Sequence, residues 1–144
     1  MAEIYNKQDN AAGFYKIPKE LTHYVDHKDY KTEMSMLYGI IVQLYNVEMG
    51  YAYPSISKLA LLYGKGERTT GNQLAKLEKI GLIKRFRGQQ GNYCYIPLKP
   101  LSKAEFFKKY PDAFENYKTR IQKADEERER SMNNLRRHRK SQNK

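Results

Sequence analysis

The most constraining feature of this chain is the stretch 54–98, in which helix and strand signals follow one another at short intervals. Its first half holds two short runs with apolar residues at helical spacing, separated by a turn that contains Gly64 and Gly66. Its second half holds two strand-like runs, 82–87 and 92–98, joined by a polar loop. The apolar positions of the two helical runs are Leu59, Ala60, Tyr63, Leu74, Leu77 and Ile80.

This order of elements predicts a winged helix-turn-helix, a mainly α fold (α+β) in which a β-hairpin forms the wing. We place the domain at residues 13–100, after a flexible N-terminus at 1–12. A broad apolar stripe predicts a long scaffold helix at about 32–48, and 51–53 is expected to be a short strand. Ser55 is expected to cap the next helix, because its hydroxyl can accept a hydrogen bond from an amide of the first turn.

The remaining residues, 101–144, predict a helical C-terminal extension with a basic tail. A short helix begins near Ser102 and is closed by Pro111, and a second helical run follows it. The cluster 136–140 is expected to be frayed in isolation. Three roles stay open for the tail: a solubilising end, a set of phosphate contacts, or part of a helix at 112–140 that binds a protein partner or a second copy.

The distribution of charge favours a polyanionic partner. The chain has a formal net charge of +11, and this charge is uneven along the sequence. Residues 1–57 hold five Lys or Arg against seven Asp or Glu, residues 58–117 twelve against five, and residues 118–144 ten against four. The positive charge therefore begins where the helix-turn-helix pattern begins, and double-stranded DNA is the expected partner.

Residues 67–80 are the candidate recognition helix. Its buried side is expected to hold Thr70, Leu74, Leu77 and Ile80, and the N-terminal half of the opposite side would enter a major groove. Arginine can pair with guanine, and asparagine or glutamine with adenine, as direct base reading requires. The side chains expected on the exposed face are Arg68, Thr69, Asn72, Gln73, Lys76 and Lys79.

The hairpin is expected to lie along a phosphate backbone or in a minor groove, where arginine is favoured. Its last strand alternates Tyr93 and Tyr95 with Cys94 and Ile96, which predicts one packed and one exposed face. Cys94 is interpreted as a small buried hydrophobe. The residues expected to contact DNA in the turn, helix and wing are Lys65, Arg68, Thr69, Asn72, Gln73, Lys76, Arg85, Arg87, Gln89, Gln90 and Asn92.

No catalytic residues, metal site or cofactor are expected, and we do not expect an enzyme. The segment 64–66 is too short for a phosphate-binding loop, and His23 and His27, four residues apart, lack an obvious third metal ligand. A single cysteine excludes an internal disulfide framework. The sequence shows neither a membrane-spanning length of apolar residues nor a signal peptide, so we expect a cytoplasmic bacterial protein associated with nucleoid or plasmid.

The span 14–98 resembles the N-terminal DNA-binding domain of Firmicutes plasmid replication initiators, the RepA N-terminal type, and related helix-turn-helix modules of phages and mobile elements. The motifs that carry the resemblance are Phe14-Tyr15-Lys16-Ile17-Pro18-Lys19-Glu20-Leu21, Met36-Leu37-Tyr38-Gly39, Pro54-Ser55 leading to Leu59-Ala60, Arg68-Thr69-Thr70 with Leu74, Leu77-Glu78, and Gly81-Leu82-Ile83.

The resemblance implies sequence-specific binding of duplex DNA, often as a homodimer on repeated or palindromic sites. It assigns Lys65, Arg68, Thr69, Asn72 and Gln73 to the turn and recognition helix, and 85–92 to the wing. Two departures matter: Gly71 lies inside the candidate recognition helix, and we expect no counterpart of the further C-terminal domain that full initiators carry. We therefore expect a transcriptional regulator or a replication-origin-binding protein of a phage or mobile element.

Two alternatives from other classes remain. A winged helix can serve as a protein-interaction module of replication machinery, like a helicase-loader adaptor, with the helix at 112–140 holding the partner. Alternatively, the tyrosines and the basic tail could bind single-stranded nucleic acid or RNA by stacking and charge. Replacing Arg68 or Asn72 would matter only if the chain binds duplex DNA through the candidate recognition helix.

Overall fold

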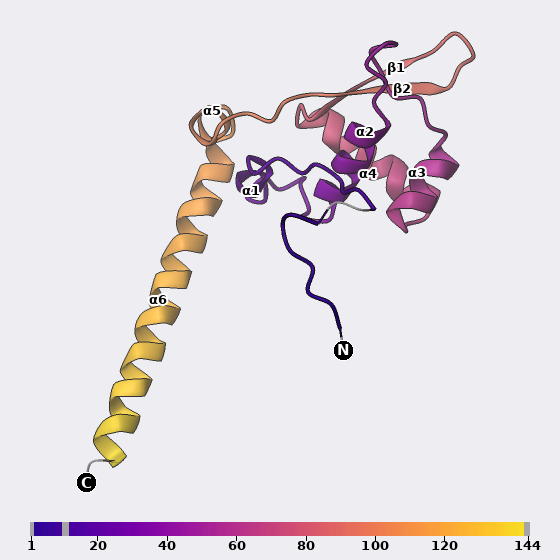
Figure 1. Ribbon diagram of the computed structural model, residues 1–144. Helices are drawn as coiled ribbons and strands as arrows, with labels where there is room; N and C mark the ends of the chain where they lie inside the picture. Colours follow the sequence, from indigo (N-terminus) through magenta and orange to yellow (C-terminus); the bar gives the residue numbers. More distant parts are fainter. Residues whose placement is uncertain (1, 10–11, 143–144) are drawn as a thin grey trace. The chain divides into compact units, whose positions relative to one another are not determined.

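The computed structural model describes residues 2–9 and 12–142 of the chain (Figure 1). Parts of the expected N-terminal segment and of the basic tail, at residues 1, 10–11 and 143–144, lie outside the described residues. The chain forms two compact units, which we call the first and the second unit. The first comprises Met1–Thr22 and Asp29–Pro100, and the second comprises His23–Lys28 and Leu101–Lys144.

The first unit contains the helices α2 (Met34–Leu44), α3 (Ile56–Tyr63) and α4 (Glu67–Lys79); the short α1 (Leu21–Tyr24) lies at its boundary. Helix α2 is shorter than the predicted 32–48. It ends at Leu44 because Tyr45 is extended and the Asn46 side chain accepts hydrogen bonds from the amides of Glu48 and Met49, which starts a turn. A polar side chain that competes for backbone amides therefore shortened the helix.

The predicted boundaries of α3 are confirmed. The Ser55 hydroxyl accepts from the Lys58 amide at 3.1 Å, and Gly64 adopts φ +75° at the other end, a conformation that favours glycine. Gly66 then precedes α4 in an extended conformation. The three residues between the helices, Gly64, Lys65 and Gly66, therefore make the tight turn of the motif.

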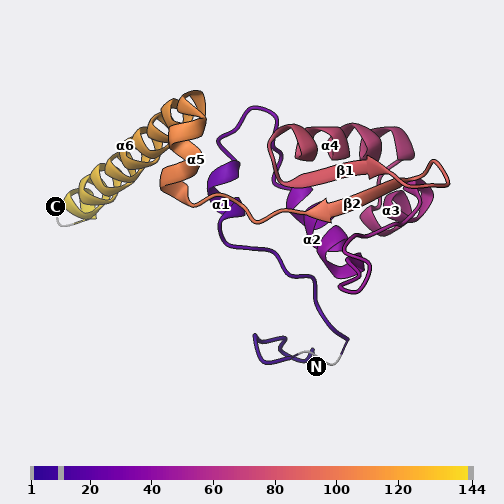
Figure 2. The same ribbon diagram turned by 90° about the horizontal axis from the view of Figure 1, so that it is seen from above.

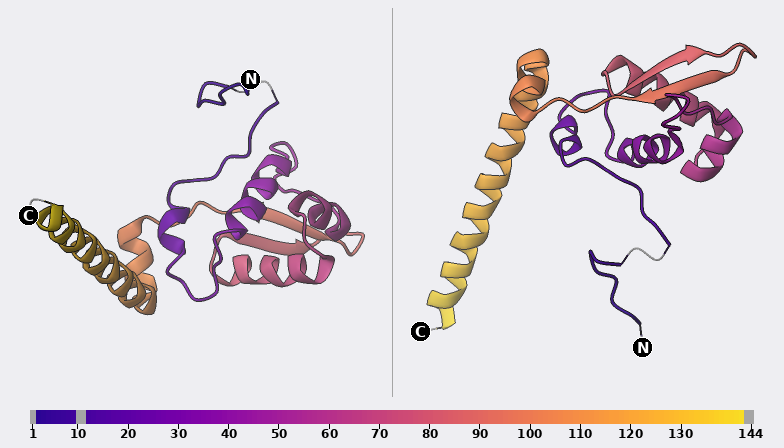
Figure 3. Two further views of the ribbon diagram at one scale, coloured as in Figure 1. Left: turned by 90° about the horizontal axis from the view of Figure 1, so that it is seen from below. Right: turned by 45° about the horizontal axis from the view of Figure 1, so that its top comes forward.

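The wing is an antiparallel hairpin of β1 (Ile83–Arg87) and β2 (Tyr93–Pro97), with Arg87 opposite Tyr93. Ala52 pairs with Tyr95 of β2 through two backbone hydrogen bonds of 2.8 Å. The strand expected at 51–53 is therefore reduced to isolated bridges, this one and a second between Tyr51 and Asn46. Helix α4 runs alongside the hairpin (Figure 2), and the hairpin tip reaches beyond the helices of this unit (Figure 3).

The core of the first unit lies between α2, α3, α4 and the inner face of the hairpin. The alternation predicted for β2 is wrong, because Cys94 and Tyr95 are both buried. Tyr95 faces inward together with Ala52, whereas the Cys94 sulfur lies under the wing backbone, 3.2 Å from where a Cβ on Gly88 would stand. Fully buried aliphatic side chains of this core include Met34, Leu37, Ile40, Ile41, Leu59, Leu74, Leu77, Ile80, Leu82 and Ile83.

The second unit is built from α5 (Lys103–Lys109), α6 (Pro111–Gln142) and the segment 23–28. Pro111 both closes α5 and starts α6, since the first helical position does not need the missing amide hydrogen. The rings of Tyr24 and Phe106 pack with centroids 4.3 Å apart. Contrary to the expected fraying, residues 136–140 continue α6 as helix.

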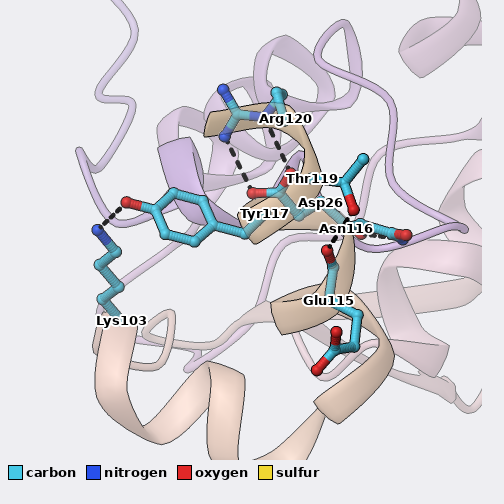
Figure 4. A network of polar contacts seen from close by, with 7 residues as sticks. All are labelled: Asp26, Lys103, Glu115, Asn116, Tyr117, Thr119 and Arg120. Atoms are coloured by element: carbon cyan, nitrogen blue, oxygen red, sulfur yellow. Dashed lines mark hydrogen bonds and ion pairs between the residues drawn. The ribbon is translucent and has the colours of Figure 1, made fainter. Parts of the chain in front are cut away.

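An ion pair anchors α6 to the segment 23–28 (Figure 4). The buried Asp26 carboxylate accepts two hydrogen bonds from the Arg120 guanidinium, both at 3.0 Å, and the Asn116 amide donates to the Asp26 carbonyl at 3.1 Å. Because the Arg120 guanidinium is hydrogen-bonded to the Asp26 carboxylate, its pKa is raised above the ordinary value for arginine. This paired geometry fixes the first turns of α6 within the second unit.

Candidate nucleic-acid interface

The exposed face of α4 carries three polar side chains without an intramolecular polar partner among the described residues. Arg68 and Asn72 are one helical turn apart, and Thr69 lies beside them. All three are exposed, as expected from the helical spacing, while Lys76 is half-buried one turn further along. The N-terminal half of α4 therefore presents donors and acceptors of the kinds that pair with base edges.

Gln73 does not belong to this face, so its predicted exposure is wrong. Its side chain is 5% exposed, and its amide is satisfied inside the molecule. The Tyr63 hydroxyl donates to Gln73 Oε1 at 2.6 Å, and Gln73 Nε2 donates to Glu33 Oε1 at 2.7 Å. Because both ends of the amide are used, Gln73 holds α4 against α3 and the start of α2, and we remove it from the interface.

Glu33 organises the turn between α3 and α4. Its second oxygen lies 2.9 Å from the Lys65 ammonium, so the carboxylate links the turn to α4 through Gln73. Hydrogen bonds from Lys65 and Gln73 lower the pKa of the Glu33 carboxyl. Burial, with the nearby charge of Glu33, raises the pKa of Tyr63 to about 12. Lys65 is exposed as expected, but its charge is opposed by Glu33.

Arg85 also differs from its expected role. Its guanidinium donates to Glu78 at 3.1 and 3.2 Å, and its backbone amide donates to the same carboxylate at 3.1 Å. The side chain is 16% exposed. Arg85 therefore ties the end of α4 to β1, which fixes the wing relative to the recognition helix, and its charge is not available in the way a phosphate contact requires.

The wing tip is held by Arg87. Its guanidinium donates to the Gly91 carbonyl at 2.8 Å and lies over the Tyr93 ring, 4.5 Å from the centroid. Gly91 adopts φ +84°, which closes the tip. Gln89, Gln90 and Asn92 are exposed on it. The tip thus combines one cation with three uncharged amides.

His23 and His27 lie elsewhere, in the second unit. The His23 ring nitrogen is 2.8 Å from the Leu101 carbonyl oxygen, and His27 meets the edge of Tyr110. Among the residues that the structure describes, no group of three His, Cys, Asp or Glu side chains is arranged to hold a metal ion. Within the same ranges no helix is long and apolar enough to cross a membrane.

Comparison with known proteins agrees with this geometry. Residues 35–83 match the family model described as a helix-turn-helix domain. The first unit is a winged helix-turn-helix. The prediction of this fold from the sequence is confirmed. No curated protein matches the chain by sequence.

Three solved structures share the winged helix-turn-helix. An N-terminal domain of a DNA binding protein matches with a TM-score of 0.55 and 21% identity, covering 76% of this chain and 92% of that one. A Rep–DNA complex has the same TM-score and identity, with coverages of 74% and 92%. An MDR initiator matches with a TM-score of 0.54 and 17% identity, with coverages of 77% and 98%. These neighbours agree with the resemblance to initiator N-terminal domains.

Several residues that shape the winged helix-turn-helix were missed from the sequence. Glu33, Tyr63 and Glu78 act through partners seven or more residues away, which periodicity cannot reveal. Tyr93 was noted only as a strand residue, yet Arg85 and Arg87 both lie over its ring, at 4.8 and 4.5 Å. The alternation of arginine and tyrosine across the hairpin was the one available signal.

Proposed function

We propose that the winged helix-turn-helix binds specific sites in duplex DNA, with α4 in the major groove and the wing tip on the adjacent backbone. The observation that best supports this proposal is the exposure of three neighbouring side chains on α4, Arg68, Thr69 and Asn72. None of them has an internal polar partner among the described residues. A structural surface helix usually presents charges that pair with one another, as Lys118 does with Glu115 on α6. Here the side chains remain available for bases.

Charge supports the same arrangement. Lys76, Arg87 and, more weakly, Lys65 would contact phosphates, and Gln89, Gln90 and Asn92 would add uncharged contacts from the tip. The fold neighbours described as a DNA binding protein and a Rep–DNA complex also support the proposal. The cellular role we propose is regulation of transcription or marking of a replication origin for a phage or mobile element.

We also propose that two copies bind together, because helix-turn-helix proteins reach useful specificity by reading two half-sites about one helical turn apart. The end of α6 would strengthen this binding without regard to sequence. Arg136, Arg137, Arg139 and Lys140 are exposed there and have no ion-pair partner within the described part of the chain. They can attract phosphates wherever the duplex runs past them.

A second candidate function is binding of a protein partner through α6. Ile121, Met132 and Leu135 are 42–50% exposed on this helix, although the helix is otherwise strongly polar. An apolar side chain at such positions can anchor a partner helix. In that case replacing Ile121 would abolish activity and replacing Arg68 would not.

The experiment that tests the main proposal is selection of binding sites from random duplex DNA, followed by competition with non-specific duplex at 50 and 200 mM salt. We expect an enriched motif and, if six to ten phosphates are neutralised, an affinity about 10³–10⁵-fold lower at the higher salt. Arg68→Ala is expected to lose the motif, whereas Lys19→Ala, an exposed cation outside α4 and the wing, retains it. No motif together with a flat salt response would contradict the proposal.

A further inference from the structure

The outer face of the hairpin carries aromatic side chains where a solvated sheet face would normally be polar. Ala52, Tyr95 and Arg85 are cross-strand partners, so their side chains share the inner face. Tyr51 and Tyr53 flank Ala52 and therefore point to the opposite face. Phe86, next to Arg85 along β1, points the same way.

These rings line a hollow of about 500 Å³. Tyr51 meets Phe86 edge-to-face with centroids 5.4 Å apart, and it meets Tyr53 in a similar geometry at 6.1 Å. Tyr53 remains 51% exposed, and Met49 at the rim is 48% exposed. Because half of Tyr53 is exposed, its ring offers a surface on which a flat ligand can stack.

The polar rim of the hollow narrows the choice of ligand. Gln90 and Asn92 lie on it, and their side-chain amides can donate to and accept from the edge of a base. Arg87 is the single charged residue among the ten described lining residues, none of which is acidic. Aromatic faces, amides and one cation form a set that suits a nucleobase attached to a phosphate.

We propose that this hollow binds an unpaired base of DNA. The inference extends the proposed duplex binding, because the wing tip that we propose to contact the duplex backbone also forms one end of this hollow. The wing would then contact paired DNA with its tip and hold an unpaired base on its outer face. This chemistry belongs to strand opening or to recognition of a bulged or single-stranded junction.

The test uses the full chain with a single-stranded oligothymidylate of 12 nucleotides that contains one 5-iodouracil. Ultraviolet irradiation joins this base to an aromatic ring stacked on it, and mass spectrometry identifies the joined residue. We expect attachment at Tyr51, Tyr53 or Phe86. Attachment confined to α4 or to residues 136–140 would overturn the inference.

Variants make the test quantitative. Tyr53→Leu is expected to lower the affinity for the oligothymidylate about tenfold or more and to leave affinity for the selected duplex within about twofold. Tyr53→Phe keeps a ring and retains the affinity, and Tyr5→Leu removes an exposed tyrosine outside the hollow without effect. Phe86→Leu removes a second ring of the hollow and is expected to give the same loss of affinity for the oligothymidylate. Unchanged single-strand affinity in both leucine variants would refute the site, whereas loss of duplex binding in Arg68→Ala alone concerns only the proposed function.

Discussion

At the scale of single residues, the position of α4 depends on a short chain of hydrogen bonds that ends at Glu33. Tyr63 donates to Gln73, and Gln73 donates to Glu33, which also holds Lys65. The Tyr63 hydroxyl and the Gln73 amide are both buried, so removing one of them leaves the other without its partner in a buried place. Arg68 and Asn72 are therefore positioned in part by Glu33, Tyr63 and Gln73, which lie outside the proposed interface.

Gln73→Glu is expected to destabilise the first unit by roughly 3 kcal/mol at pH 7, because it places a second carboxylate beside Glu33 in a buried position. The loss should shrink near pH 4, where one of the two carboxyls takes a proton. Urea unfolding at pH 7 and pH 4 measures this loss of stability. Asn72→Asp makes the same amide-to-acid change at an exposed neighbour and should cost less than about 0.5 kcal/mol. Equal losses in the two variants would contradict the assigned network.

Tyr63→Phe is expected to change how stability depends on alkaline pH. The folded-state pKa of Tyr63 is raised from 10.0 to about 12, so the wild-type contribution is intact below pH 10 and is lost as pH rises through 12. The variant lacks this ionisation and should lose less stability between pH 10 and 12. At pH 8 it should be roughly 1–3 kcal/mol less stable, since Gln73 Oε1 loses its donor. The stabilities of the wild-type protein and Tyr63→Phe are compared by thermal unfolding across this pH range. The same dependence of stability on pH in both proteins would contradict the raised pKa of Tyr63.

At the scale of secondary-structure elements, α4 is continuous through Gly71. A Cβ added at Gly71 meets nothing within 4 Å, and its backbone is not in the left-handed region. The glycine is therefore not required by packing in the first unit. It lies between Arg68 and Asn72 along the helix, where close approach of the backbone to DNA would explain it.

Gly71→Ala is expected to stabilise the first unit by roughly 1 kcal/mol, the difference between the two residues in a helix. Duplex binding should weaken, because a methyl group is added beside the side chains that we propose to read bases. Ala75→Gly, at an exposed position one turn further along, is the matched opposite change and should destabilise by about the same amount. A destabilised Gly71→Ala protein would contradict this account of α4.

One ion pair contributes to the attachment of α6 within the second unit. Arg120→Ala leaves the Asp26 carboxylate buried without its partner and is expected to cost about 1–3 kcal/mol, less than a fully buried pair because Arg120 is half exposed. Hydrogen exchange in residues 111–123 should speed up accordingly. Arg130→Ala breaks only a surface pair with Glu126 and should have no measurable effect. Equal rates of hydrogen exchange in residues 111–123 of the two variants would contradict the anchoring role of the ion pair.

The order of helices and strands was predictable because helical spacing, glycine turns and serine caps are local signals. The exposure of Arg68 and Asn72 follows from the same spacing. The burial of Gln73 could not be predicted from this spacing, because its partners lie 10 and 40 residues away in the sequence. A glutamine at the boundary between the buried and exposed faces of a helix can belong to either face. The role of Arg85 and the early end of α2 were likewise decided by Glu78 and Asn46.

At the scale of the whole molecule, two kinds of positive charge have different roles in the proposed function. Cations of α4 and the wing would set the register of the duplex, and those of residues 136–140 would raise affinity for any duplex. Only Arg68, Thr69 and Asn72 would then distinguish one sequence from another. These three side chains would therefore determine the sequence specificity of DNA binding, which is distinct from its affinity.

The most direct measurement compares the affinity of the wild-type protein and Asn72→Ala for the selected site and for each single-base-pair change of that site. We expect Asn72→Ala to lose discrimination at one or two adjacent positions, by about 1–3 kcal/mol, and to keep it elsewhere. Lys76→Gln, as a phosphate-contact control, should weaken binding to all sites uniformly. An unchanged profile of base preference in Asn72→Ala would contradict base reading by α4.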